Sequence, residues 1–205
     1  LGFPSVADGP VTEPVDLAML AALAEVADSV TEAFEGYDYA RALERAEAFF
    51  WSFCDDYIEL VKGRAYGDGP AAESALRALR LALDAQLRLF APFLAFATEE
   101  VWSWWREGSV HRAPWPRPDE LPGGGEPAVL SAAGEVLAQV RKAKSSAQVS
   151  MKTPVTRLVV RDTAERVELV RAALTDLVNA GVVTGEVLLE AGEPVVDVTL
   201  EAAQP

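Results

Sequence analysis

The chain has 205 residues, of which half are hydrophobic and 24% are charged, as in an ordinary globular protein with one large domain or two small ones. With 18 Lys and Arg against 32 Asp and Glu the net charge is −14, which argues against a broadly basic nucleic-acid surface but leaves room for a local patch. No apolar run approaches the roughly 18 residues that span a membrane. Because no basic segment precedes an apolar stretch at the start, we expect no signal peptide.

The single cysteine, Cys54, cannot form an internal disulfide, so we expect a cytoplasmic protein. Because the chain starts with Leu1 and not with Met, we expect a piece of a longer protein.

Residues 1–14 predict an irregular lead-in, and Thr12 is a candidate cap for a helix that runs to about Phe34. A second helix is predicted over about 38–65, a third after Pro70, and a fourth from about Phe93 to Gly108. The second helix has apolar residues at alternating spacings of four and three: Ala46, Phe50, Phe53, Tyr57 and Leu60. Residues 15–108 therefore predict an antiparallel bundle of four or five helices.

Residues 109–128 are rich in Pro and Gly and predict a linker. Beyond it, a helix is predicted over about 128–147, a strand over 155–160, a second helix ending near Gly181, and strands over 187–189 and 195–200. Residues 129–205 thus predict a small α+β subdomain. The predicted fold class is mainly α, a helix bundle followed by this subdomain.

Nothing in the sequence indicates catalysis. His111 is the only histidine and Cys54 the only cysteine, so a Cys/His zinc site is excluded and a catalytic dyad would depend on a histidine in a Pro-rich segment. No glycine-rich phosphate-binding motif lies between a strand and a helix. We therefore predict no catalytic residue, no metal ligand and no cofactor in this chain.

One segment departs from the acidic composition. Residues 136–161 contain no Asp or Glu but six basic residues: Arg141, Lys142, Lys144, Lys152, Arg157 and Arg161. Arg141, Lys144 and Gln148 have the spacing of one helical face. The pattern fits a phosphate-binding patch for RNA, or a solvated face next to acidic parts of the same fold.

Four motifs carry a resemblance to a known family. Residues 49–60 read FFWSFCDDYIEL, residues 90–102 read FAPFLAFATEEVW, and the pieces SV at 109–110 and PWP at 114–116 follow. Together they resemble the anticodon-binding domains of class I aminoacyl-tRNA synthetases of the valine, isoleucine and leucine group. The segments VRKAKS at 140–145 and VSMKTPV at 149–155 resemble the valyl members in particular. Asp56 and Ala95 depart from the pattern, since many relatives have Trp and Pro there, and no heptads of a coiled-coil arm follow before Pro205.

The resemblance implies a region that docks tRNA(Val) for a parent enzyme which uses ATP and Mg²⁺. Its partners would be tRNA(Val) and the catalytic domain of the same chain, with no role for DNA or membranes. The candidate RNA-binding residues either continue the first motif or lie in the valyl segments: Lys62, Arg64, Tyr66, Arg141, Lys142, Lys144 and Lys152. Two alternatives remain, a helical protein-interaction module and the equivalent domain of an isoleucyl or leucyl enzyme.

Overall fold

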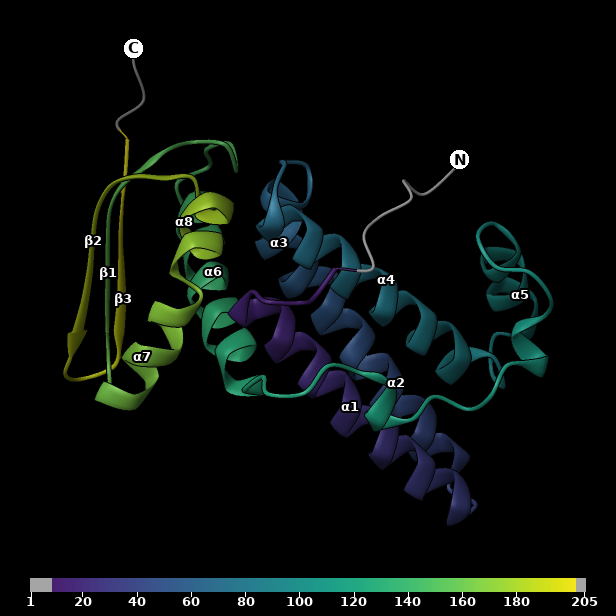
Figure 1. The fold of residues 1–205 in the computed structure, drawn as a ribbon. Coiled ribbons are helices and arrows are strands. Elements are labelled where there is room, and N and C mark those ends of the chain that lie inside the picture. The colour runs from purple at the N-terminus through teal and green to yellow at the C-terminus, as the bar shows by residue number, and fades with distance from the viewer. Residues whose placement is uncertain (1–8, 202–205) are drawn as a thin grey trace.

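The computed structural model describes residues 9–201. Its first half is a helix bundle built from α1 (Pro14–Glu35), α2 (Tyr39–Ser52), α3 (Ile58–Ala65), α4 (Pro70–Phe90) and the shorter α5 (Ala95–Ser103) (Figure 1). The predicted bundle is confirmed. The capping prediction was wrong in detail, because Glu13 occupies the N-cap of α1 without a side-chain cap bond. The backbone N–H groups of Thr12 and Glu13 instead donate to Ser74 Oγ, at 3.0 and 3.1 Å.

The second predicted helix contains a π-helical segment that the spacing of its apolar residues does not indicate. Between α2 and α3 lies a π-helical segment, η1 (Phe53–Tyr57). The extra residue of a π-turn shifts side chains around the axis, and here Asp56 lies against helix α6 (Pro127–Ser146). The helices approach so closely that a Cβ built on Gly134 would lie 3.0 Å from Asp56 Cγ.

The Pro- and Gly-rich segment runs along the bundle surface and makes specific contacts with it. It contains two short 3₁₀ turns, η2 (Val110–Arg112) and η3 (Pro118–Glu120). Trp115 meets the ring of Phe34 edge to face and donates from Nε1 to Thr31 Oγ1 at 2.8 Å. Gly125 passes so close to α1 that a Cβ there would lie 2.0 Å from the carbonyl oxygen of Leu17. Gly123 has open space around it, so of these two glycines only Gly125 depends on the absence of a side chain.

The second half is the predicted α+β subdomain. After α6 come β1 (Val155–Asp162), α7 (Ala164–Ala172), α8 (Leu174–Gly181), β2 (Val183–Ala191) and β3 (Val195–Leu200). The sheet order is β2-β1-β3, with β2 parallel and β3 antiparallel to the central strand β1. Helices α6, α7 and α8 lie between this sheet and the bundle, so the molecule has three layers (Figure 1).

One hydrophobic core joins the two halves. Buried apolar residues run continuously from α1 through α6 into the sheet, for example Leu23, Leu137 and Leu158. Most of the apolar burial that stabilises the fold therefore lies in a single cluster. None of the described helices has the length and apolar character to cross a membrane.

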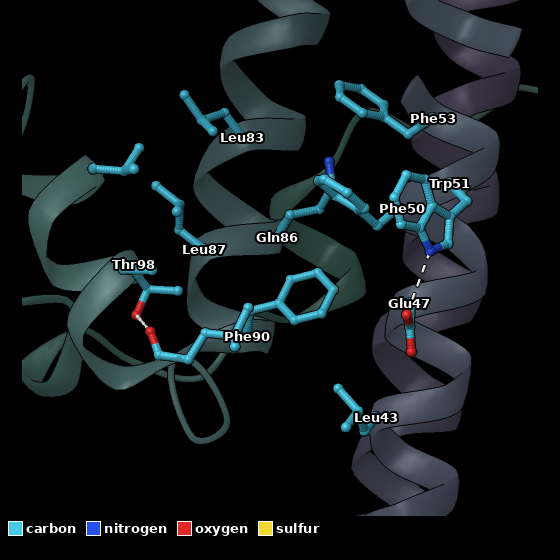
Figure 2. Close-up of a pocket in the computed structure, with 13 residues that line it drawn as sticks. Leu43, Glu47, Phe50, Trp51, Phe53, Leu83, Gln86, Leu87, Phe90 and Thr98 are labelled. Carbon is cyan, nitrogen blue, oxygen red and sulfur yellow. Dashed lines mark hydrogen bonds between the residues drawn. The ribbon is translucent and has the colours of Figure 1, made fainter. Parts of the chain in front are cut away.

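A smaller core holds α5. It consists of Leu87, Ala91, Trp102 and Val110, so α5 packs chiefly on α4 and η2. Across from it, α2 and α4 meet through the edge-to-face rings of Phe50 and Phe90, whose centroids are 5.8 Å apart. A groove remains open between α2, α4 and α5 (Figure 2).

Candidate nucleic-acid interface

Four of the seven sequence-predicted RNA-binding residues gather around one hollow, which we call the basic hollow. It lies between α3, α6, the loop after α6, and α8, and encloses about 330 Å³. Lys62, Arg141, Lys144 and Lys152 contribute to its wall, although up to 90 positions separate them in the sequence. The complete lining is Glu59, Lys62, Gly63, Leu137, Val140, Arg141, Lys144, Met151, Lys152, Asn179, Ala180 and Val182.

The rim of the basic hollow carries the exposed Lys62 and the half-buried Arg141, which both pair with the same glutamate. Lys62 Nζ lies 2.6 Å from Glu59 Oε2, and Arg141 donates to the same oxygen at 3.0 Å and to the carbonyl of Asp55 at 2.8 Å. Ion pairs at this exposure contribute at most about 1 kcal/mol, so a phosphate can compete with Glu59 for both cations. Lys152 is exposed, and its side chain has no ion pair within residues 9–201.

Lys144 has a different role from the one predicted. Its side chain is only 1% exposed, and Nζ donates to the carbonyls of Met151 at 2.9 Å and Gly181 at 2.8 Å. Burial lowers the pKa of Lys144, because desolvation disfavours the charged ammonium. Gln148, at φ 55°, turns the chain back after α6 and so brings Met151 to this position. We therefore remove Lys144 from the set of proposed phosphate ligands.

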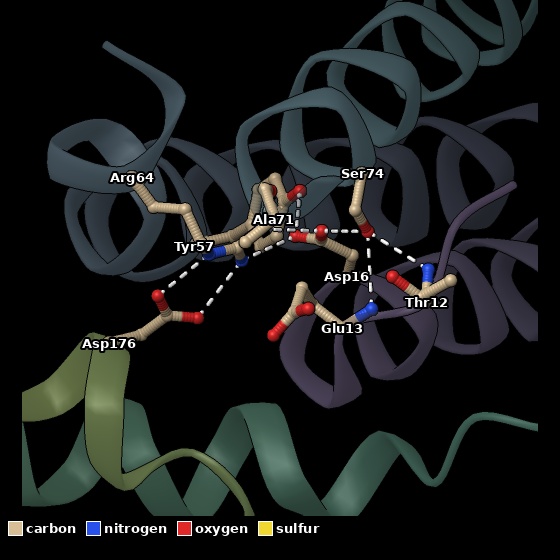
Figure 3. A network of polar contacts seen from close by, with 8 residues as sticks. All are labelled: Thr12, Glu13, Asp16, Tyr57, Arg64, Ala71, Ser74 and Asp176. Atoms are coloured by element: carbon tan, nitrogen blue, oxygen red, sulfur yellow. Dashed lines mark hydrogen bonds and ion pairs between the residues drawn. The ribbon is translucent and has the colours of Figure 1, made fainter. Parts of the chain in front are cut away.

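Arg64 is also buried. Its guanidinium forms two-point contacts with Asp16 and with Asp176, all between 2.8 and 2.9 Å, and donates to the carbonyl of Ala71 at 2.7 Å (Figure 3). Burial alone would lower the pKa of Arg64, but the hydrogen bonds to the two carboxylates raise it well above its usual value. Since the Arg64 side chain is only 8% exposed, it also leaves the set of proposed RNA ligands.

The Arg64 network connects four α-helices and the π-helical segment η1. Asp16, on α1, is fully buried and also accepts hydrogen bonds from Tyr57 Oη at 2.8 Å and Ser74 Oγ at 2.7 Å. Tyr57 comes from η1, Ser74 from α4, and Asp176 from α8. Every polar atom of this buried site thus has a partner, and the network fixes α8 of the subdomain against the bundle (Figure 3).

Tyr66 and Lys142 lie outside the lining of the basic hollow but are exposed. The Tyr66 ring, at the end of α3, is 91% exposed and one turn beyond Lys62. Lys142 extends from α6 without an ion pair in the part of the chain that the structure describes. Exposed aromatic rings and free ammonium groups are the side chains that stack on unpaired bases and contact phosphates.

The remaining cations of residues 136–161 pair with acidic side chains of the same subdomain. Arg157 and Arg161 form cross-strand pairs with Glu186 and Glu190, each at 3.1 Å. The interpretation as a face next to acidic parts of the same fold therefore holds for the two strand residues. Lys142 and Lys152 have no ion pair among the described residues and stay predicted phosphate contacts.

Two lining residues were missed by the sequence reasoning. Asn179 brings an amide to the basic hollow from the last turn of α8, and Val182 follows it with φ 55°. Left-handed backbone is unfavourable for a β-branched residue. Only the packing of α8 against α3 places them here, and no motif or charge pattern in the sequence marks them.

Comparison with known proteins adds independent information. A family model described as the anticodon-binding domain of tRNA ligase matches residues 16–160. The valine–tRNA ligase of Thermobifida fusca (strain YX) is 53% identical over 188 residues, which cover 89% of this chain and 21% of that protein. The valine–tRNA ligase of Bifidobacterium longum (strain NCC 2705) is 47% identical over 217 residues, covering 95% of this chain and 24% of the relative. The chain thus spans under a quarter of the length of these relatives.

Proposed function

Because the chain belongs to the family of anticodon-binding domains of tRNA ligases, we propose that it is the tRNA-docking region of a valine–tRNA ligase. The relatives above carry that name, which favours valine over isoleucine or leucine. Aminoacylation, with its ATP and Mg²⁺, would take place in parts of the enzyme outside this chain. Residues 9–201 contain no group of three or more His, Cys, Asp or Glu side chains that could hold a metal ion, so we assign no step of that reaction here.

The observation that carries the proposal is the basic hollow with its neighbours. In a chain of net charge −14, the exposed Lys62 and Lys152 and the half-buried Arg141 converge from separate segments. Lys142 and Tyr66 extend this surface along α6 and at the end of α3. In this arrangement the cations contact phosphates and set the register of the anticodon stem and loop, and Tyr66 stacks on an unpaired base.

The test is binding of this chain to tRNA(Val) and to an anticodon-swapped tRNA over a salt series. The double variant Lys142→Glu and Lys152→Glu is compared with Arg117→Glu and Arg171→Glu, which has the same net charge but changes exposed arginines elsewhere. Each lost phosphate contact should reduce the slope of log affinity against log salt by about 0.7–0.9. We expect the first variant to lose about two such contacts and the control to lose none.

The outcomes separate the possibilities. Equal weakening by both double variants would show that only the overall charge matters and would refute the basic hollow as the contact surface. Equal binding of the two tRNAs would refute anticodon recognition by this chain. Charging assays of the full-length enzyme with valine, isoleucine and leucine would identify the amino acid. As a tRNA ligase region, the chain would act in the cytoplasm beside the catalytic part of its own enzyme.

A further inference from the structure

A second surface of the molecule has the opposite chemistry. We call it the apolar groove: it lies between α2, α4 and α5, encloses about 560 Å³, and is lined mainly by aliphatic and aromatic side chains (Figure 2). Leu43, Phe50 and Trp51 form the α2 side, and Leu83, Leu87 and Phe90 form the α4 side. The remaining lining residues are Glu47, Phe53, Gln86, Leu94, Ala97, Thr98 and Val101.

Large apolar side chains are exposed at this groove. Trp51 and Leu94 line the groove and are 53% and 52% exposed. Phe96, which follows on α5 outside the lining, is 92% exposed. Contiguous apolar surface rimmed by polar residues marks sites of protein contact, because its exposure to water is unfavourable. The small core that seats α5 on α4 and η2 leaves the α2 side of the groove unfilled.

The charge of the groove favours a protein occupant over RNA. No Lys or Arg belongs to its lining, where Glu47 is the only charged residue. Glu44 stands next to Glu47 in a shallow hollow that also includes Trp51. These carboxylates would repel the phosphates of any nucleic acid whose base stacked on Trp51. They would attract Lys or Arg at the edge of an apolar peptide segment.

The length of the relatives indicates where such a segment comes from. The chain corresponds to only 21–24% of them, so more than three quarters of the polypeptide lies elsewhere. We propose that the apolar groove docks a segment from that remaining part of the same polypeptide, with apolar side chains between α2 and α5 and a Lys or Arg opposite Glu44 and Glu47. This inference depends on the length of the relatives, and not on RNA contact at the basic hollow.

Thiol labelling tests the proposal in the full-length ligase and in this chain alone. In a Cys54→Ser background, Ala97→Cys places a thiol on the α5 wall, and Ser131→Cys places one on the outer face of α6 as the control; both native positions are exposed. Mass spectrometry of each labelled peptide removes interference from other cysteines. We expect Ala97→Cys to react at least about tenfold more slowly in the full-length enzyme, as for an interface closed more than nine-tenths of the time, and Ser131→Cys to react equally in both.

Charge and ligand dependence complete the test. Adding Glu47→Lys to full-length Ala97→Cys should restore fast labelling, whereas the double reversal at Lys142 and Lys152 should leave its protection unchanged even if tRNA binding is lost. Protection that appears only with tRNA would identify RNA as the occupant and overturn the proposal. Protection in the isolated chain that grows with its concentration would identify a second copy and also overturn it. So would equal labelling of Ala97→Cys in both proteins.

Discussion

Replacing Arg64 with Met tests whether the buried ionic network fixes the subdomain against the bundle. The substitution keeps most of the side-chain volume but removes five hydrogen bonds, two to each carboxylate and one to a carbonyl. It leaves Asp16, with 0% exposure, and Asp176, with 5%, without their shared cation. Removing one partner of a buried ion pair typically costs about 3–5 kcal/mol, a large part of the roughly 5–15 kcal/mol that stabilises a domain.

The assay is urea unfolding followed by the fluorescence of the five tryptophans. We expect Arg64→Met to lower the free energy of unfolding by about 3–5 kcal/mol. Arg64→Lys should lower it by roughly 1–3 kcal/mol, because an ammonium keeps the charge but cannot bridge two carboxylates with a planar fork. Arg171→Met is the control, since Arg171 is exposed and pairs only with Glu168.

A double-mutant cycle with Asp176→Asn makes the reasoning refutable. If the two side chains interact as the structure shows, the double variant should lose less stability than the sum of the single variants. Additive effects would contradict direct coupling between α3 and α8. A loss at Arg64→Met no larger than that of the control would refute the structural role altogether and return Arg64 to the candidate RNA ligands.

Three further predictions concern stability and use the same unfolding assay. Lys144→Met should cost about 1–3 kcal/mol at neutral pH, because two buried carbonyls lose their donor. Burial lowers the pKa of Lys144 in the folded chain, so between that pKa and the ordinary value of 10.5 the unfolded chain binds more protons than the folded chain. The difference in free energy of unfolding between wild type and Lys144→Met should therefore widen as pH rises through this window. A constant difference would contradict a buried, charged Lys144. Gly125→Ala should destabilise by more than about 1 kcal/mol through its clash with α1, while Gly123→Ala is tolerated; equal effects would show that the segment is not packed there. Gly134→Ala should destabilise at the crossing of α6 with η1, whereas Gly63→Ala, in open space within α3, should stabilise by roughly 0.5–1 kcal/mol; stabilisation by both would show that the crossing relaxes freely.

The helices were predictable because their causes are local. Apolar spacing and Pro or Gly at the ends placed the main helices of the bundle, as with Pro70 at the start of α4. The single helix predicted to end near Gly181 was wrong, because the structure divides it into α7 and α8. The π-turn was not predictable, since Phe53 and Tyr57 keep a spacing of four that suits a regular helix equally well. Whether residues 109–128 act as a linker or pack on the bundle depends on contacts such as that of Trp115 with Phe34, which composition does not encode.

The burial of a candidate site residue was likewise predictable only where its cause is local in the sequence. Lys142 and Lys144 look alike in the sequence, yet one is exposed and the other buried. A local signal did exist for Lys144, because it continues the buried stripe of Leu137 and Val140 at helical spacing. No comparable signal existed for Arg64, whose partners lie 48 and 112 positions away.

The two buried cations help to position the helix that borders the basic hollow. Arg64 holds α8 through Asp176, and Lys144 holds its end through the carbonyl of Gly181. Together they fix the helix that supplies Asn179 to the basic hollow. Arg64 is paired inside the protein with Asp16 and Asp176, so these charges form no part of the surface. Within the lining of the basic hollow, Lys62, Arg141 and Lys152 stand against one carboxylate, that of Glu59, so the charge of the described lining is positive. Net charge excludes a uniformly basic surface, but it cannot exclude a site whose cations come together only in the folded chain.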